Sequence, residues 1–421
     1  MGSLTTVVVG ATVVVVFDEV LPVPPAQAAT SSSDSSVVVT LRMTVSLCGR
    51  ARVPAARLTG DLPRGHPGYA PPMDVGSLEA RALEVLDRAA YDYFAGGADD
   101  EVTLRDNEQA WRRIRLLPRV MRDVSSVTTA RELLGTSTAA PMLVAPMAFQ
   151  RMAHPEGEIA MAKAAAAAGI PMVISTMSTT TLEDVAVAVP DGIHWFQFYV
   201  HKDRDLSRRL LERAVASGCT AVVLTVDLAV VGRRRRDEAN RFELPGHLTA
   251  ANLEKSLESS GGSALSEYSN HAFEQAITPA LLEWVAGLSE LPLLVKGVLH
   301  PDDASAAIDV GAAGVIVSNH GGRQLDGAVA TADALGPVVE AVAGRVPVLV
   351  DGGIRGGTDV VKAMALGADA VLVGRPALWG LALGGAVGAA AVLQELIDEL
   401  ARAMTLCGVT TLAEIDRSLL A

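Results

Sequence analysis

Residues 314–326 read Gly314-Val315-Ile316-Val317-Ser318-Asn319-His320-Gly321-Gly322-Arg323-Gln324-Leu325-Asp326. The four residues at the start predict a short buried strand, and the residues beyond it supply an imidazole, two glycines and a guanidinium. His320 can act as a base near neutral pH, and Arg323 can hold a carboxylate through a two-pronged hydrogen-bonded fork. The stretch therefore predicts a strand end with chemistry suited to removing a proton from a small anion.

Short apolar runs of this kind recur along the chain, and Ala-rich helical stretches such as 156–168, 205–217, 301–310 and 358–366 separate them. The strand candidates are residues 142–146, 172–175, 195–199, 221–227, 293–296, 315–318, 346–351 and 370–374. Eight parallel strands with helical crossovers predict an α/β fold of the (β/α)8 TIM barrel type, which takes about 250 residues. A doubly wound open sheet is the alternative, but no Gly-x-Gly-x-x-Gly follows the first strand.

The barrel prediction also places the active site, because sites of this fold lie at the C-terminal ends of the strands. Polar residues interrupt the apolar runs at these ends, including Ser175, Gln197, Tyr199, Thr225, Asp227, Lys296, Ser318 and Asp351. Residues 351–358 and 373–376 add glycines and two arginines after the last two strands, where barrels commonly bind phosphate. We therefore expect one polar rim that includes a phosphate site.

The nine residues 318–326 resemble the signature of the FMN-dependent 2-hydroxy acid oxidases and dehydrogenases. The resemblance extends, with similar order and spacing, from about Met73 to the C-terminus. It implies a TIM barrel with an N-terminal helical segment, FMN as cofactor, a small-molecule 2-hydroxy acid as substrate, and a homotetramer.

The resemblance also implies which residues hold FMN. Met147 and Ala148 match backbone contacts to the flavin, and Lys296 matches a lysine beside N1 and O2 of the ring, where a cation stabilises negative charge. Asp351 matches a contact to the ribityl chain. The other implied contacts are Ser175, Gln197, Thr225, Ser318, Gly352, Gly353, Arg355, Gly374 and Arg375.

For the substrate, the resemblance implies a carboxylate clamp of Arg323 and Arg234, with hydroxyl donors from Tyr93 and Tyr199. It implies that Asp227 orients His320 and stabilises its protonated form, as the acid of a catalytic triad does. Tyr199 and Lys296 join this pair as the catalytic set. Arg234 is one of four consecutive arginines at 233–236, a run that would ordinarily form a solvated face.

The implied reaction oxidises an L-2-hydroxy acid to a 2-keto acid. Two routes remain open, because the α-hydrogen can leave as a hydride while His320 takes the hydroxyl proton, or as a proton that His320 takes. Oxygen as acceptor gives an oxidase and hydrogen peroxide, whereas a quinone or cytochrome gives a dehydrogenase. A redox-neutral flavin barrel and a barrel that only binds a ligand are the rival hypotheses.

One departure bears on the substrate. Met177 stands where glycolate oxidases carry a tryptophan, so a flexible thioether replaces a bulky wall. A roomier pocket favours lactate and longer or aromatic hydroxy acids, although an ordinary core methionine would look the same in the sequence. The polar segment 254–270 is expected to form a mobile lid.

Composition narrows the class of protein. The chain has 421 residues, of which 50% are hydrophobic and 20% charged, and it carries a net charge of -13. Such a charge argues against nucleic acid or an anionic membrane as the main partner. The three cysteines, Cys48, Cys219 and Cys407, are far apart, which fits a reducing cytoplasm, and no metal site is predicted.

The first 72 residues differ from the rest, because their Val-rich runs keep no helical or barrel period. One interpretation is a secretory signal peptide, since Ala26-Gln27-Ala28-Ala29 resembles a cleavage site. Against it, no Lys or Arg precedes the apolar run, and Asp18 and Glu19 interrupt it. No membrane insertion is expected, because no stretch of this segment reaches the ~18 uncharged apolar residues of a membrane span.

The other interpretation is that residues 1–72 are a disordered or misassigned extension, with translation beginning at Met73. We therefore assign residues 73–421 to an FMN-binding (β/α)8 barrel domain. Its first helix is predicted to start with Ser77 as its N-cap and to end at Gly96-Gly97.

Overall fold

The structure is a computed structural model that describes residues 4–9, 12–17, 75–253 and 270–421. The chain divides into two units, Met1–Tyr69 and Ala70–Ala421. In the first unit, β1 (Leu4–Val9) and β2 (Thr12–Phe17) pair as antiparallel strands, which the sequence analysis did not predict. The rest of the predicted extension, and the predicted lid apart from Asn270, lie outside the described residues.

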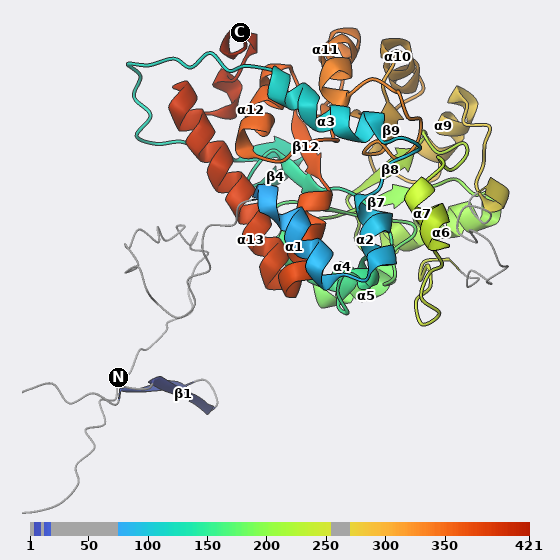
Figure 1. Ribbon diagram of the computed structural model, residues 1–421, viewed down its shortest axis with the longest axis horizontal. Coiled ribbons are helices and arrows are strands. Elements are labelled where there is room, and N and C mark those ends of the chain that lie inside the picture. Colours follow the sequence, from blue (N-terminus) through green and yellow to red (C-terminus); the bar gives the residue numbers. More distant parts are fainter. Residues whose placement is uncertain (1–3, 10–11, 18–74, 254–269) are drawn as a thin grey trace, which may run out of the picture. The chain divides into compact units, whose positions relative to one another are not determined.

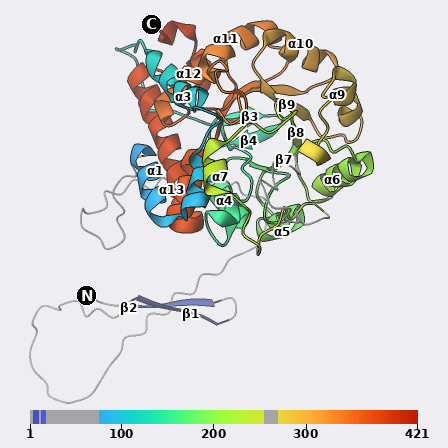
Figure 2. The same cartoon turned by 45° about the vertical axis from the view of Figure 1, so that its right-hand side comes forward.

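The second unit is built on a closed barrel of eight parallel strands (Figures 1 and 2). The strands are β5 (Met142–Val144), β6 (Met172–Ile174), β7 (His194–Phe198), β8 (Ala221–Thr225), β9 (Leu293–Val298), β10 (Gly314–Val317), β11 (Val348–Val350) and β12 (Ala370–Val373). Each predicted strand overlaps one of them, so the predicted (β/α)8 barrel is confirmed. The polar residues that ended the predicted runs lie at or just past the C-terminal ends of the strands.

Helices connect successive strands and surround the barrel (Figure 2). They are α4 (Gly157–Ala167), α5 (Leu182–Ala188), α6 (Arg204–Ala216), α7 (Arg235–Asn240), α9 (Pro279–Ala286), α10 (Pro301–Asp309), α11 (Thr331–Val342), α12 (Gly357–Ala365) and α13 (Arg375–Cys407). Short 3-10 turns lie at Gln150–Met152, Leu412–Glu414 and Arg417–Leu419. Right-handed crossovers of this kind bury both faces of every strand.

The barrel interior is packed with side chains and is not a pore. Alternate residues of the strands point inward and form one buried cluster that includes Leu143, Val173, Trp195, Leu294, Ile316, Leu349 and Leu372. A small hairpin of β3 (Arg131–Leu133) and β4 (Thr136–Thr138) adds Leu133 to this cluster. Because the interior is filled, a ligand can enter only above this core, at the C-terminal ends of the strands.

The N-terminal helical segment is broken, whereas the sequence predicted one helix. α1 (Leu78–Val85) and α2 (Arg88–Ala95) meet at Asp87, whose carboxylate accepts a hydrogen bond from the Ala89 N–H at 2.9 Å and so caps α2. Ser77 stands at the predicted N-cap position of α1, but its backbone is helical and its side chain makes no capping hydrogen bond. A third helix, α3 (Val102–Arg113), precedes the barrel.

Among the described residues, α13 is the one helix that is long and apolar enough to cross a membrane by length and composition. Just over half of its most apolar window, 56%, is buried. Its backbone leaves the helical conformation at Gly384 and Gly385, and it contacts α1, α4 and α12. The apolar character of α13 is therefore accounted for by packing against the barrel helices.

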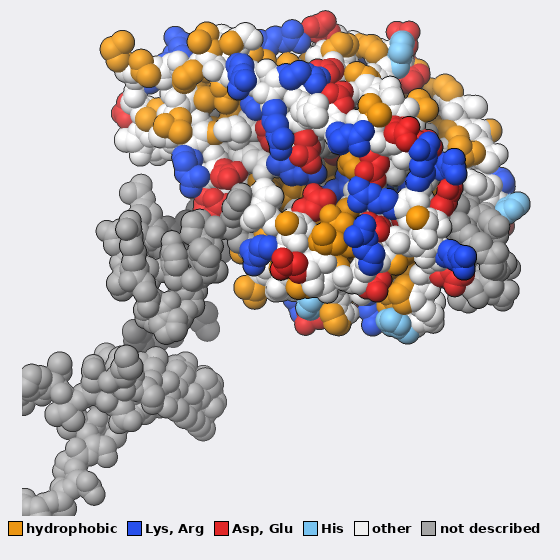
Figure 3. Space-filling model, viewed as in Figure 1, with side chains coloured by type: hydrophobic (Ala, Val, Ile, Leu, Met, Phe, Trp, Pro, Cys, Tyr) orange, Lys and Arg blue, Asp and Glu red, His pale blue; other side chains and the backbone are white. Residues whose placement is uncertain are grey.

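An apolar patch lies where the loop after α3 meets the end of α13, at one edge of the face in Figure 3. The side chains of Leu117, Val120, Met121 and Leu406 form it, and Met121 is fully exposed. A backbone hydrogen bond from the Arg119 N–H to the Cys407 carbonyl, at 3.1 Å, holds the loop there. We call these four residues the edge patch.

Candidate active site

One pocket opens at the C-terminal ends of the strands and encloses about 1230 Å³, counting the part that is open to solvent. The pocket wall contains Tyr93, Met147, Ala148, Ser175, Met177, Gln197, Tyr199, Thr225, Arg234, Lys296, His320, Arg323, Asp351, Gly352, Gly353, Arg355, Gly374 and Arg375. The other two predicted site residues, Asp227 and Ser318, are outside this wall but form hydrogen bonds with His320 and Lys296 in it.

His320 is held against Asp227 at the rim. The carboxylate Oδ1 of Asp227 accepts a hydrogen bond from Nδ1 of His320 at 2.9 Å, which leaves Nε2 for a ligand. The backbone of His320 is left-handed, with φ of 58°, a conformation that costs energy and recurs at active sites. Gly297, in a bulge of β9, lets Asp227 approach, because a Cβ there would lie 2.6 Å from the Cβ of Asp227.

The electrostatics of this pair leave a neutral imidazole beside an anionic carboxylate. Burial lowers the pKa of His320 below its ordinary value, and the neighbouring Asp227 offsets only part of that effect. Burial alone would raise the pKa of Asp227, but the charge and hydrogen bond of His320, with the charge of Lys296, hold it below its usual range. His320 is therefore available as a base at neutral pH.

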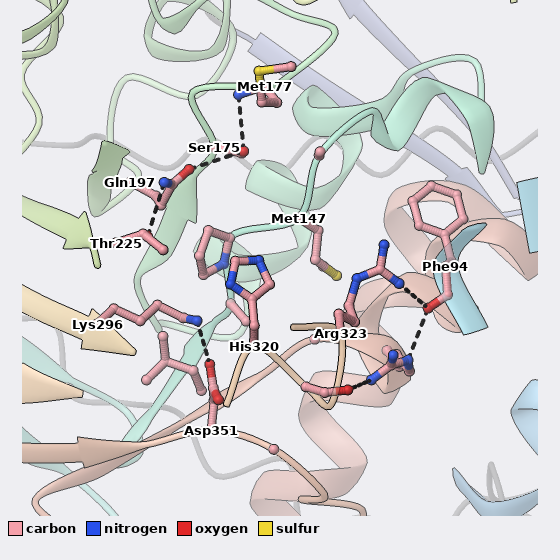
Figure 4. Close-up of a pocket in the computed structure, with 18 of the residues that line it drawn as sticks. Phe94, Met147, Ser175, Met177, Gln197, Thr225, Lys296, His320, Arg323 and Asp351 are labelled. Atoms are coloured by element: carbon pink, nitrogen blue, oxygen red, sulfur yellow. Dashed lines mark hydrogen bonds and ion pairs between the residues drawn. The ribbon is translucent and has the colours of Figure 1, made fainter. Parts of the chain in front are cut away.

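Lys296 provides a buried positive charge from the adjacent strand β9, beside His320 (Figure 4). Its Nζ lies 3.1 Å from Oδ2 of Asp351 and donates a hydrogen bond to Oγ of Ser318 at 2.8 Å. Burial would lower the pKa of Lys296, but Asp351 and Asp227 raise it above its ordinary value. Oδ1 of Asp351 is buried and has no partner among the described residues.

A chain of neutral polar groups lines the pocket wall at the ends of β6, β7 and β8 (Figure 4). The side-chain carbonyl of Gln197 accepts a hydrogen bond from the Ser175 hydroxyl at 3.3 Å, and its amide donates to the Thr225 hydroxyl at 3.1 Å. The Ser175 hydroxyl in turn accepts from the Met177 N–H at 3.1 Å. These contacts fix the side-chain orientations of three successive strand ends.

Two arginines lie over the ring of Tyr93. The guanidinium carbons of Arg323 and Arg234 lie 5.1 and 5.7 Å from the ring centroid. Arg323 is anchored through one nitrogen, which donates to the carbonyls of Tyr93 at 2.6 Å and Gly96 at 2.9 Å. Nε of Arg234 is buried and has no partner within the described part of the chain. The remaining donors suit a carboxylate ligand.

Of the four consecutive arginines, Arg233 and Arg235 are exposed and Arg234 lines the pocket. Arg233 pairs with Glu238, Arg235 with Asp100, and Arg236 with Glu101, while Arg234 lies 4.0 Å from Asp237. Because Asp100 and Glu101 lie between α2 and α3, two of these pairs fasten the N-terminal helices to the loop after β8. The run therefore helps to hold the Tyr93 segment over the pocket.

The two predicted phosphate-binding loops differ in which of their groups can contact a ligand. Gly352 and Gly353 have positive φ angles of 89° and 81°, a backbone conformation that residues other than glycine rarely adopt. Arg355 pairs with Glu108 at 2.9 Å. Arg375 donates from its three nitrogens to the carbonyls of Phe94, Gly96 and Gly321, so it supports the pocket wall as well as lining it.

The pocket also has apolar walls that the sequence analysis missed. They include Phe94, Phe149, Leu228, Val231, Phe273, Ile354 and Leu378. Phe273 stacks on Tyr199 with ring centroids 4.8 Å apart. Leu228 directly follows Asp227 and Val231 lies four residues after it, so their position in the chain offered a signal. Nothing local marked Phe273, which the fold brings back from a distant segment.

Comparison with known proteins decides the family. The sequence pattern of a family described as FMN-dependent dehydrogenase matches residues 82–421. The chain belongs to this family. An L-lactate oxidase from Nostoc is 49% identical over 361 residues, covering 83% of this chain and 98% of that protein. Glycolate oxidase 3 from Oryza sativa subsp. indica is 46% identical over 349 residues, covering 82% and 95%.

Solved structures of the family agree. A crystal structure of mandelate oxidase with (S)-4-hydroxymandelic acid has a TM-score of 0.78 and 44% identity, covering 83% of this chain and 98% of that one. Mandelate oxidase with benzoyl-formic acid has a TM-score of 0.76 and the same identity. The resemblance inferred from residues 318–326 is thus confirmed at the level of family and fold.

The residues of the pocket fit FMN, the cofactor of this family. The unpartnered carboxylate oxygen of Asp351 suits a ribityl hydroxyl, and the charge of Lys296 suits an electron-rich ring. The backbone of Gly352 and Gly353 lines the pocket, with Arg355 and Arg375 also in its wall, and this arrangement suits a phosphate. These donors extend from β9 to β12, a span that an elongated cofactor would need.

Proposed function

We propose that this member of the family oxidises an L-2-hydroxy acid to the 2-keto acid, with oxygen as the electron acceptor. The observation that carries the proposal is the neutral His320, paired with Asp227, beside the carboxylate donors of Arg323 and Arg234 in one pocket. Relatives named as lactate, glycolate and mandelate oxidases support the choice of oxygen.

The chain's own residues account for binding and proton transfer. Arg323 and Arg234 hold the substrate carboxylate, and the Tyr199 hydroxyl stays protonated because burial raises its pKa. Nε2 of His320 takes a proton from the substrate, and Asp227 stabilises the resulting imidazolium. FMN supplies the two-electron acceptor when it is bound. The substrate loses two electrons and two protons in all.

The test is anaerobic mixing of the FMN-loaded protein with glycolate, lactate, mandelate, 4-hydroxymandelate and longer 2-hydroxy acids. We expect at least one acid to bleach the visible absorption of the flavin, and air to restore it rapidly with release of hydrogen peroxide. Bleaching that air reverses only slowly, but a quinone reverses fast, would replace the oxidase by a dehydrogenase. Bound FMN that no acid bleaches would refute the proposed reaction.

The activity should depend on pH through His320. The base must be neutral, and its pKa lies below the ordinary value of about 6.5 because of burial. We therefore expect kcat/KM to be constant near neutral pH and to fall as the pH drops through the pKa of His320, below 6.5. A steady-state profile from pH 4.5 to 8 measures this, and an acidic limb centred above pH 7 would contradict it.

We further propose that the substrate side chain is larger than that of glycolate. Met177 is buried in the pocket wall, and Phe149, Leu228, Val231 and Phe273 add apolar surface. This composition suits lactate, longer aliphatic acids or an aromatic acid such as mandelate. The names of the L-lactate oxidase and mandelate oxidase relatives support this substrate class.

Replacing Met177 by tryptophan (M177W) should narrow the pocket. We expect kcat/KM for the best large substrate to fall about tenfold or more relative to glycolate, because pocket volume discriminates at that level. The ratio of kcat/KM values for the two acids is the measurement. Met152, which lies outside the pocket wall, offers the control substitution M152L. An unchanged ratio in M177W would remove Met177 from the specificity argument.

We also propose a homo-oligomer, with a tetramer as the expected state. The edge patch supports it, because Val120 and Met121 are 73% and 100% exposed and monomers rarely leave large apolar side chains grouped in solvent. Sedimentation velocity should give a mass four times that of the chain. Met121→Asp should lower that mass if the edge patch is an interface, and a monomeric wild-type protein would refute the proposal.

A further inference from the structure

Helix α3 contributes no residue to the pocket wall, yet it contacts two of the loops that form it. One is the loop after β10, which carries His320. The other is the loop after β11, which carries Asp351, Gly352 and Gly353. Leu104, Asn107 and Trp111 on α3 make these contacts. A single rigid element therefore supports both the base and the predicted cofactor loop.

Asn107 and Asn319 form a reciprocal pair of side-chain hydrogen bonds. The amide of Asn107 donates to Asn319 Oδ1 at 2.9 Å, and that of Asn319 donates to Asn107 Oδ1 at 2.8 Å. Both residues are buried, so water does not compete for these groups. Asn319 Oδ1 also accepts from the Gly322 N–H at 3.1 Å. The pair thus fixes the loop both before His320, at Asn319, and after it, at Gly322.

The cofactor loop is attached to the same asparagine. Asn107 Oδ1 accepts from the Thr331 N–H at 3.3 Å, and the Thr331 hydroxyl donates to the Asp351 carbonyl at 2.6 Å. The backbone of Asn107 lies against Gly353, where a Cβ would be only 2.3 Å from the Asn107 carbonyl oxygen. Asn107 cannot shift without disturbing the segment around Asp351.

We propose that Asn107 is a positioning residue that couples the loop of His320 to the loop that holds FMN, so that cofactor binding and placement of the base depend on each other. The inference rests on the proposed function of His320. The coupling is carried by one buried amide that bonds directly to Asn319 in the loop of His320 and reaches the cofactor loop through Thr331. Loss of the bonds to Asn319 or of those through Thr331 leaves buried polar groups unpaired, and the protein relieves this cost by moving a loop.

The opposing explanation is that Asn107 only stabilises α3. In that case Asn107 variants would lower thermal stability, and a substitution in one loop would change only the function of that loop. Asn319→Ala, in the loop of the base, would slow the reaction without changing FMN affinity. Thr331→Val, on the side of the cofactor loop, would weaken FMN binding without slowing a fully loaded enzyme.

The experiment measures both quantities in N107A, N107D, N319A and T331V. FMN affinity is measured by fluorescence titration of the flavin-free protein, and proton removal by the rate of anaerobic flavin bleaching at saturating FMN and substrate. Gln109→Ala is the matched control, because Gln109 is an exposed amide on the same helix. Circular dichroism checks folding, and N107D keeps the side-chain shape if N107A fails to fold.

We expect a substitution in either loop to impair the function of the other loop by about tenfold or more, the size that follows when a buried amide loses its partner. N319A should weaken FMN binding, T331V should slow bleaching, both Asn107 variants should do both, and Q109A should do neither. FMN affinity within twofold of wild type in N319A, or a bleaching rate within twofold in T331V, would overturn the proposal. If no acid bleaches the wild-type flavin, the proposed function fails separately, and the FMN affinity of N319A still decides the coupling.

Discussion

Replacing His320 by glutamine (H320Q) is expected to lower kcat by about 10²–10⁴-fold, the contribution that a positioned general base makes. Glutamine keeps polarity at the strand end but cannot accept a proton at neutral pH. FMN affinity should change little, because Lys296 and Asp351, which are assigned to the cofactor, pair with each other and not with the His320 side chain. Anaerobic flavin bleaching at saturating substrate measures the loss directly.

The matched control is His300→Gln. His300 is exposed at the start of α10 and lies outside the pocket wall. H300Q should keep the wild-type bleaching rate. A rate in H320Q within tenfold of wild type, with FMN bound, would show that another group removes the proton.

Replacing Asp227 by asparagine (D227N) should lower kcat by about 10²-fold or more, although the two side chains have the same shape. The amide cannot stabilise the imidazolium that forms when His320 takes a proton, and it can favour the tautomer with the proton on Nε2. Asp227 raises the pKa of His320, so its loss should also move the acidic limb of the kcat/KM profile to lower pH. Flavin bleaching and the pH profile together measure these effects.

The double variant distinguishes this mechanism from loss of stability. If Asp227 acts through His320, then H320Q/D227N should be no slower than H320Q alone, because residues that act as a unit are not additive. Independent losses that multiply in the double variant would mean that Asp227 has another role. An acidic limb that stays in place in D227N would contradict the assigned electrostatic coupling.

Arg323 and Arg375 show how one side chain can serve both structure and chemistry. Both are half-buried, and desolvation lowers the pKa of Arg323 to about 10 and that of Arg375 to about 9, so both remain charged at neutral pH. Each donates to backbone carbonyls at the C-terminal end of α2. Cations are favourable at that end of a helix, and here they also fix Tyr93 over the pocket.

Sequence alone determined the barrel, its eight strands and the rim on which the polar residues lie. The reason is physical: a parallel strand buried on both faces must be apolar, so a polar residue directly after such a run marks a strand end. Strands of one barrel place these ends on the same side. Residues 318–326 then named the family, and thereby the cofactor, through a run of specific residues in fixed order.

Only the tertiary structure decided which distant groups meet. Asp326 illustrates this, because it lies in the signature yet accepts hydrogen bonds from the N–H groups of Asp100 and Thr103 and so caps α3. The pairing of Arg235 with Asp100, the stacking of Phe273 on Tyr199 and the Asn107–Asn319 pair were equally invisible beforehand. Each depends on contacts between segments far apart in the chain, and no local period or composition encodes such contacts, because they form only when the barrel closes and the N-terminal helices pack against its rim.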